Sequence, residues 1–416
     1  MTATLTRAWT RVPRWLVAVV DQGLVAILNL ALSVTITQVA GVTTLGRFAI
    51  VATTTTLCMG VARLLVTDPW LASRSASTTP GSELRWLVGL AAVGAAIVTA
   101  VVVLIVGDGD GRWLIAVPIA AAVVVQDFGR YLSFRVERTT GAFASDLGVL
   151  AGATITFAIA ALSGKVGLAT VLLAWLVGLV VGIVVVAGRM AGPTGPAGAL
   201  AWWRTHCRFL ATRLAFDTVA YMVGVSGSLY LLAYVGTQRD VGLVRIVQTM
   251  FSPAALVVTG LTMWLVPFLA NRSPGQAERV RARATFWLMA GALPLVILAV
   301  LLGPWFAQLV FGVDDGPSYL ALALAGVSTL AMALAAPWVA GARVSGHYLP
   351  IAWSRAAAAV TTIVGMLTVP ALRSTAGYLG LLAFQNVTVA ATAITIGVRR
   401  PVEPLQRAET QRPDAV

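Results

Sequence analysis

Long apolar stretches alternate with short polar ones along the whole chain. A bilayer core about 30 Å thick needs roughly 20 apolar residues per helix, and twelve stretches reach that length. They lie at about 16–38, 43–66, 86–106, 113–134, 142–163, 167–188, 209–235, 242–269, 285–302, 317–340, 348–369 and 377–398. The pattern predicts an all-α polytopic membrane protein with about 12 transmembrane helices.

Composition supports this prediction. Hydrophobic residues make up 58% of the 416 residues, charged residues only 11%, and the mean hydropathy is +0.88. A soluble domain of this length needs far more charged surface. The composition therefore excludes a soluble globular protein.

Basic residues gather in alternate loops. If the amino terminus is cytoplasmic, the loops and termini on that side carry 19 basic residues and the opposite loops carry five. The positive-inside rule then places both termini in the cytoplasm and the protein in the cytoplasmic (inner) membrane. This topology accounts for the net charge of +13, with anionic lipid as the partner of the basic loops. No basic patch is interleaved with aromatic residues, so we expect no nucleic-acid partner.

The two halves of the chain share a spacing. Gly46 follows Asp21 by 25 residues, and Gly242 follows Asp217 by the same number. The second and eighth stretches also end in the related motifs PWLASR and PFLANR. A duplicated chain of this kind predicts two pseudo-symmetric six-helix lobes related by an axis along the membrane normal.

Loop composition sets the expected domain boundaries. Residues 1–188 form the N-terminal lobe with its short cytoplasmic N-terminus, and 209–398 form the C-terminal lobe. A Gly/Pro-rich cytoplasmic linker at 189–208 joins them, as expected for a connection without structure of its own. Residues 399–416 form a cytoplasmic tail.

Motifs for catalysis or metal binding are missing from the sequence. There is no GxxxxGK[ST] phosphate loop, and neither histidine has nearby cysteine or acid clusters. The longest predicted outer loop has about 14 residues, too few to build a glycosyltransferase or polymerase site. We therefore expect neither a cofactor nor a metal, and no enzymatic activity.

Charge inside the spans is the informative feature. A charged side chain at mid-bilayer costs about 2.5–3.5 kcal/mol on insertion scales, so it lines water or finds a partner. Arg47 lies near the outer end of the second span. Five arginines fall within the predicted spans: Arg63, Arg130, Arg213, Arg245 and Arg355.

Two of these arginines have an acid one helical turn away. Asp127 precedes Arg130 by three residues, and Asp217 follows Arg213 by four. Residues at these spacings meet on one helix face. A structural ion pair and a cargo-binding role both remain open for Arg130 and Arg213.

The other arginines have no such acid. Arg63 and Arg355 lie within about two turns of a cytoplasmic span end, so their side chains can either extend to the interface or face a cavity. Arg47 and Arg245 lie near the outer ends of equivalent spans in the two halves. These two are the stronger candidates for binding cargo.

Polar residues form stripes on two equivalent helices. In span seven, Arg213, Asp217, Tyr221, Gly224 and Ser228 share one face, and in span one Gln22, Asn29, Ser33 and Thr37 do the same. Asp21 lies about 100° from Gln22, at the edge of its stripe. Paired stripes predict that both helices border a shared polar cavity.

The opening VDQGLVAILNLALSVTITQVAGVTTLGRFAIV and the ending GVARLLVTDPWLASR resemble the polysaccharide-transporter, Wzx-like branch of the MOP flippase superfamily. The likeness covers about 16–398 and is stronger in the first half, because the second half has Leu243 opposite Arg47 and lacks the Asp-Gln pair. The residues that carry it are Asp21, Gln22, Asn29, Gly46, Arg47, Phe48, Pro69 and Arg74.

The resemblance implies a flippase that moves polyprenyl-pyrophosphate-linked oligosaccharide from the inner to the outer leaflet by alternating access. Its partners would be that glycan, the bilayer and other envelope-polysaccharide biosynthesis proteins. Arginine is the favoured partner of a pyrophosphate. Substrate-binding candidates are thus Arg47, Arg63 and Arg245, then Arg130, Arg213 and Arg355, with Gln22, Asn29, Ser33 and Tyr221 for the sugars. Asp21 and its equivalent Asp217 are candidates for ion coupling, against a structural role.

Two other functions stay open. A MATE-type ion-coupled drug or metabolite antiporter would favour an acid-rich cavity, whereas arginine exceeds acid inside these spans. An integral-membrane glycan polymerase or acyltransferase would need a large outer loop or a His/Asp cluster, and the sequence offers neither.

Overall fold

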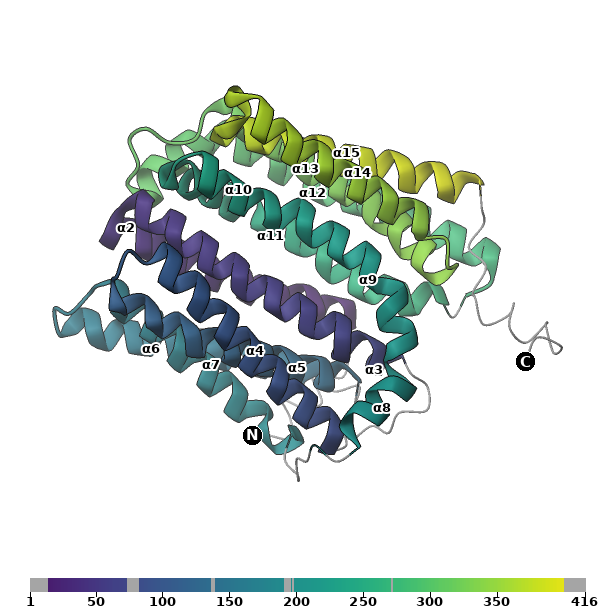
Figure 1. Ribbon diagram of the computed structural model, residues 1–416. Helices are drawn as coiled ribbons and strands as arrows, with labels where there is room; N and C mark the ends of the chain where they lie inside the picture. Colours follow the sequence, from purple (N-terminus) through teal and green to yellow (C-terminus); the bar gives the residue numbers. More distant parts are fainter. Residues whose placement is uncertain are drawn as a thin grey trace. The chain divides into compact units, whose positions relative to one another are not determined.

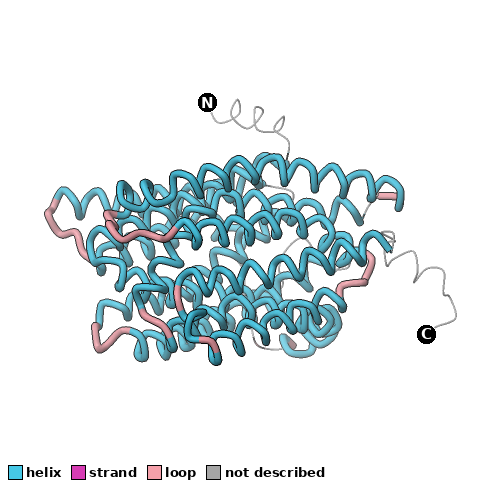
Figure 2. The backbone as a smooth tube through the Cα atoms, turned by 90° about the horizontal axis from the view of Figure 1, so that it is seen from above, coloured by secondary structure: helices cyan, strands magenta, loops and turns pink. Residues whose placement is uncertain are grey.

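The computed structural model describes residues 14–72, 82–135, 139–190, 196, 198–270 and 272–399. Over these ranges the chain forms helices joined by short loops, with no strand (Figures 1 and 2). The all-α prediction is confirmed. The N-terminus before residue 14, much of the predicted linker and the tail beyond residue 399 lie outside the described residues.

The chain divides into two compact units, Met1–Phe216 and Asp217–Val416. The first unit contains α2 (Arg14–Ala62), η1 (Arg63–Thr67), α3 (Asp68–Ala72), α4 (Ser82–Val106), η2 (Gly111–Ile115), α5 (Ala116–Arg135), α6 (Thr139–Leu162), α7 (Leu168–Met190) and α8 (Ala199–His206). Helix α8 lies within the predicted linker. The division falls inside α9 (Arg208–Met222), and the predicted domain boundaries stay predictions.

The second unit continues with the last part of α9. It then contains η3 (Val223–Gly227), α10 (Ser228–Val235), α11 (Gln238–Ala270), α12 (Pro274–Phe311), α13 (Tyr319–Val344), α14 (Leu349–Thr368), η4 (Pro370–Arg373) and α15 (Thr375–Arg399). Helix α13 packs against α11, α12 and α15, so it lies at the centre of this unit.

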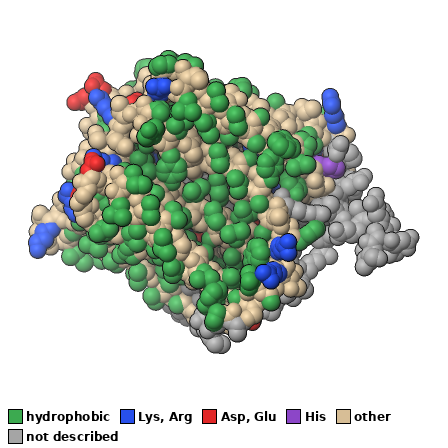
Figure 3. Space-filling model, viewed as in Figure 1, with side chains coloured by type: hydrophobic (Ala, Val, Ile, Leu, Met, Phe, Trp, Pro, Cys, Tyr) green, Lys and Arg blue, Asp and Glu red, His purple; other side chains and the backbone are tan. Residues whose placement is uncertain are grey.

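Ten helices in the described part of the chain are long and apolar enough to cross a membrane. Apolar side chains are spread over the central part of the face seen in Figure 3, and the coloured charged side chains lie toward its edges, as expected where lipid takes the place of water. The protein is therefore a multi-pass membrane protein. One of the ten segments, Val20–Trp70, has 51 residues, more than twice the length of one crossing, and the 33-residue α11 is outside the ten. The count of twelve stays a prediction.

Helix α2 folds back on itself at Gly41. Asp21 and Arg63 are 42 residues apart in the sequence, which a straight helix would separate by about 63 Å. Both nevertheless pair with residues in the same turn of α5. Asp21 pairs with Arg130, and Arg63 pairs with Asp127. The break lies at Gly41, whose backbone has φ 82° and ψ 170°, a region essentially restricted to glycine.

Substituting Gly41 tests this hairpin. Gly41→Ala should lower the free energy of unfolding by about 1–3 kcal/mol, because the added Cβ meets no neighbour but the backbone conformation disfavours an L side chain. Gly23→Ala is the matched control, since that glycine is helical and equally open. Thermal unfolding in detergent measures both; equal effects would contradict the hairpin.

Glycines bring α6 and α7 close together. Gly148 and Gly152 on α6 face Gly178 and Gly182 on α7, and a Cβ at Gly178 would lie 2.4 Å from a backbone oxygen of α6. Such small-residue spacing allows close helix contact where no hydrophobic effect drives association. The contact fixes the position of α6, which carries part of the site described below.

Proline explains the π-helical turn η1. Pro69 has no N–H, so the carbonyl of Leu65 loses its ordinary donor four residues later, and Asp68 N–H bonds to Arg63 O with π spacing. The indole Nε1 of Trp203, on α8, donates to Leu65 O at 2.7 Å. Helix α8 is thereby fixed to the turn that begins with Arg63 (Figure 1).

A double-mutant cycle tests that explanation. Trp203→Phe should destabilise the protein by about 1 kcal/mol, because it leaves the Leu65 carbonyl without a donor. In the background of Pro69→Ala, which restores a backbone N–H, the same change should cost less. Thermal unfolding of the four variants measures the coupling; equal losses in both backgrounds would show that proline is not the reason for the bond.

Candidate functional site

A buried charge cluster occupies the first unit. The Nη2 atom of Arg130 lies 2.6 Å from Asp21 Oδ2 and 3.0 Å from Asp146 Oδ2. Its Nη1 atom lies 3.9 Å from Asp127 Oδ1. Asp127 is also held by Arg63, whose Nε and Nη2 donate to both carboxylate oxygens at 2.7 and 2.5 Å. Three carboxylates therefore share two guanidinium groups, which leaves one negative charge in excess.

Neutral groups orient the acids of this cluster. Gln126 Nε2 donates to Asp146 Oδ1 at 2.7 Å and to Ser145 Oγ at 3.2 Å. Ser145 in turn donates to the carbonyl of Gly182 on α7 at 2.9 Å. Asp21 Oδ1 is buried and accepts no hydrogen bond. A buried acceptor without a donor beside a second carboxylate is suited to hold a proton or a small cation.

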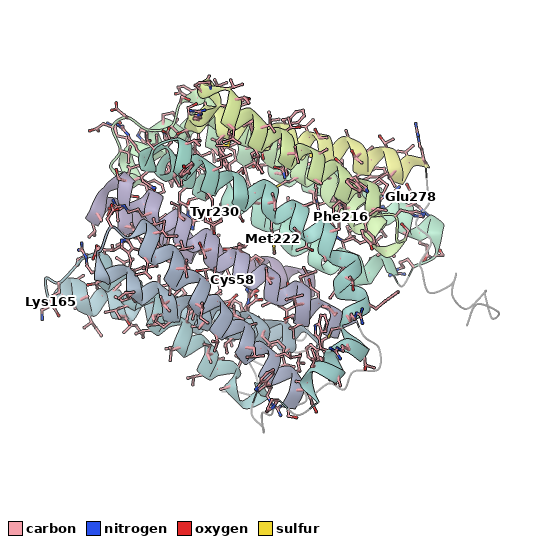
Figure 4. All side chains as sticks on the ribbon, in the orientation of Figure 1. Cys58, Lys165, Phe216, Met222, Tyr230 and Glu278 are labelled. Carbon is pink, nitrogen blue, oxygen red and sulfur yellow. The ribbon has the colours of Figure 1, made fainter. Side chains whose placement is uncertain are left out.

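The second unit has its own cluster around Asp217, which follows the labelled Phe216 in Figure 4. Asp217 Oδ2 lies 2.9 Å from Arg343 Nη2, and its Oδ1 accepts from Arg355 Nη1. The Arg355 guanidinium also lies over the ring of Tyr221, 5.3 Å from its centroid. Two arginines share one buried carboxylate here, so this cluster has one positive charge in excess.

The two clusters occupy equivalent places. Each joins an acid of the first predicted span in its half of the chain, Asp21 or Asp217, to an arginine in or just after the fourth, Arg130 on α5 or Arg343 on α13. The fifth predicted span supplies the third member, Asp146 on α6 in the first unit. In the second unit Arg355 on α14 takes that place. The first cluster contains the additional pair Asp127–Arg63. Among the other members, the fifth-span position differs between acid and base, and the sign of the excess charge reverses.

Arg47, a leading candidate from the sequence, pairs with Asp108 beyond the end of α4. In the same loop Asp110 accepts from Arg112 at 2.8 Å, and this hydrogen bond lowers the pKa of the Asp110 carboxyl from its ordinary value. The charge on Arg47 is balanced by Asp108.

Arg245, the other leading candidate, is partly buried on α11.

Three other sequence candidates are found in the clusters. Arg130 pairs with Asp127, as the spacing predicted, and also with two distant acids. Arg63 and Arg355 pair with buried carboxylates, so the alternative in which they extend alone to a span end is wrong. The side chain of Arg213 lies outside the described residues, and Asp217 is contacted by Arg343 and Arg355.

The polar stripe of the first helix is mostly enclosed. Gln22 and Ser33 are buried and Asn29 is half-buried, and Gln22 Nε2 lies 3.4 Å from Asp21 Oδ2. Tyr221 in the second unit is exposed. Their contact with sugars stays a prediction.

Sequence reasoning missed two members of the clusters. Asp146 is an acid inside the predicted fifth span, so a search for acids as well as arginines within the spans would have found it. Arg343 was counted as a loop residue because it lies just beyond the predicted tenth span. It lies in the last turn of α13, which extends to Val344.

Removing the shared arginine of the first cluster should destabilise the protein strongly. Arg130→Gln leaves buried carboxylates without a counter-charge, a loss of about 3–5 kcal/mol. Arg112→Gln is the control, because that pair is exposed and its removal should change the midpoint little. Thermal unfolding in detergent measures both. Equal midpoints for the two variants would mean that the cluster does not stabilise the unit.

No protein-family model matches the sequence, and no curated protein matches it either. Solved structures do. A mutant of the Vibrio cholerae MATE transporter VcmN gives a TM-score of 0.63 at 14% identity, covering 96% of this chain and 98% of that one. An inward-facing MATE family transporter of the MOP superfamily gives 0.58 at 13%, covering 95% and 96%. The lipid II flippase MurJ gives 0.59 at 11%, covering 92% and 88%. The chain therefore has the fold shared by these transporters.

Proposed function

We propose that the protein is an alternating-access transporter that flips polyprenyl-pyrophosphate-linked oligosaccharide from the inner to the outer leaflet of the cytoplasmic membrane. The observation that carries this proposal is the excess positive charge at Asp217, Arg343 and Arg355. A charge buried near lipid is costly. Arg355 is partly buried and Arg343 is exposed in the last turn of α13, and the two share one carboxylate. An anionic ligand at Arg343 would supply the missing counter-charge.

Pyrophosphate fits this cluster. Its oxygens match the paired N–H donors of a guanidinium group, which bind phosphate in two-bond geometry. Arg343 is 38% exposed and Arg355 12% exposed, so a ligand can reach the first while the second stays fixed against Asp217. The polyprenyl chain would remain in the bilayer, because its transfer into a polar site costs about 0.8 kcal/mol per methylene group.

The first unit is suited to coupling. Its excess negative charge and the unpaired oxygen of Asp21 offer a place for one proton or sodium ion. Binding there would replace a repelling charge with a neutral pair. The driving ion would then bind in the first unit and the anionic cargo in the second. The coupling residue would be Asp21 rather than Asp217.

This acidic cluster also favours a second candidate function, an ion-coupled antiporter for cationic drugs or metabolites. MATE transporters and MurJ share the fold with this chain to a similar degree. The fold is one of transporters rather than of the polymerase or acyltransferase considered from the sequence. The sign of the cargo charge distinguishes the two transport functions.

Deleting the gene tests the proposal. Intact lipid-linked oligosaccharide should accumulate on the cytoplasmic leaflet, measured by glycan labelling of right-side-out and inverted vesicles. Wild-type protein should restore export, whereas Arg355→Gln with Arg343→Gln should reduce it at least tenfold at equal protein level, because the head group loses both guanidinium partners.

Arg112→Gln is the control, since it removes a basic residue outside both clusters and should export normally. Normal export in the deletion strain with a changed tolerance to cationic drugs would overturn the flippase and support the antiporter. Precursor accumulation that the double arginine variant fully relieves would retain the flippase but remove Arg343 and Arg355 from its binding site.

A further inference from the structure

A groove of about 430 Å³ lies where α12 meets α13. Trp305 and Gln308 from the end of α12, Asp314 and Asp315 from the connecting loop, and Tyr319 from the start of α13 line it. Its volume is within the range of small-ligand sites, about 300–1,000 Å³. The loop is one of those that the sequence predicts to face outward.

Contacts within the loop and with α12 hold the groove in shape. Gly312, with φ 68°, ends α12, and its N–H bonds to Gln308 O at 3.0 Å in a common helix-stop geometry. The Cα of Gly316 is so close to α12 that a Cβ there would lie 3.1 Å from the Ala307 Cβ. The Ser318 hydroxyl accepts from Ala321 N–H at 3.2 Å and caps α13. A loop held by such contacts loses less entropy when it binds a ligand.

Acceptors and aromatic rings dominate the lining. Asp315 Oδ2 lies 3.2 Å from Arg239 Nη2, and Asp314 Oδ1 lies 3.5 Å from Gln308 Nε2, so each carboxylate keeps one oxygen for another donor. Trp305 is 59% exposed and Tyr319 61% exposed. Carboxylates accept hydrogen bonds from hydroxyl groups, and a ring face carries partial negative charge that suits C–H groups.

We propose that this groove binds a saccharide, and specifically the glycan part of the cargo, so the inference rests on the proposed function. Hydroxyl groups would donate to Asp314 and Asp315 while the C–H face of a sugar ring packs on Trp305 or Tyr319. A phosphate is excluded because two carboxylates repel it and Arg239 already pairs with one of them.

The groove and the arginine cluster lie at opposite ends of α13. Tyr319 begins that helix and Arg343 lies in its last turn, a separation of about 36 Å at 1.5 Å per residue. The two sites therefore offer different chemistry to the two parts of one cargo molecule. Arginines receive the pyrophosphate at one end, and acceptors with aromatic rings receive sugars at the other.

Site-specific photo-crosslinking tests the groove in living cells. Benzoylphenylalanine is placed at Trp305 or Tyr319 of the full-length protein, with Trp287 as the matched control, an exposed tryptophan elsewhere on α12. After irradiation, adducts are analysed for glycan and for phospholipid by mass spectrometry. We expect glycan-bearing adducts at the two groove positions and phospholipid alone at Trp287. Trp305→Ala with Tyr319→Ala should slow export about tenfold, whereas Trp287→Ala should not.

The saccharide site would be contradicted if all three positions gave phospholipid adducts alone and the double alanine variant exported normally. Trp305 and Tyr319 would then be anchors at the membrane interface. The deletion strain separates the two proposals. If it accumulates precursor while the groove variants behave as wild type, only the saccharide site fails. If the deletion strain accumulates no precursor, the proposed flippase function is contradicted, and so is the saccharide site that depends on it.

Discussion

Burying charge where lipid replaces water is costly unless the charge is paired, and this constraint organises both units. Asp21, Asp127 and Asp146 share arginines in the first unit, and Arg343 and Arg355 share Asp217 in the second, because an isolated charge in a medium of low dielectric costs several kcal/mol. Helix positions follow from it. The hairpin at Gly41 brings Asp21 and Arg63 to the same turn region of α5, and the glycine contacts between α6 and α7 hold Asp146 beside them.

The duplicated frame makes a difference of one residue informative. Both units join an acid of the first predicted span to an arginine in or just after the fourth and a charged residue of the fifth. Asp146 leaves the first unit acidic, and Arg355 leaves the second basic. Charged residues inside a membrane protein face a water-filled cavity or find a partner, and they commonly mark a substrate or ion pathway. Under the proposed function, the first unit would bind a cation or proton and the second an anion.

Much of the fold follows from local sequence. Apolar runs of about 20 residues predicted the helices, and the gap between the first two runs lies at Gly41. The spacing of Asp127 and Arg130 predicted their ion pair, because residues three apart share a helix face. Pro69 was recognised as part of a motif, but the bond from Trp203 was not, because it joins residues 138 positions apart.

The composition of the clusters was beyond the sequence for the same reason. Asp21 and Arg130 are 109 residues apart, and Asp217 and Arg355 are 138 apart, so their pairing depends on how whole helices pack. Arg47 has a partner that its own helix does not reveal. Its depth and its lack of a local acid made it a leading ligand candidate, yet Asp108 from the next helix end balances it. Spacing along one helix identifies partners within that helix only.

Binding of defined lipids to the purified protein tests most directly whether Arg343 and Arg355 bind phosphate. Native mass spectrometry in detergent can compare polyprenyl diphosphate, polyprenyl monophosphate and the uncharged polyprenol at equal concentration. The diphosphate should bind most tightly and the alcohol most weakly, and Arg343→Gln with Arg355→Gln should remove this order. Equal binding of the three lipids, or an order unchanged by the two substitutions, would contradict an anion site in the second unit.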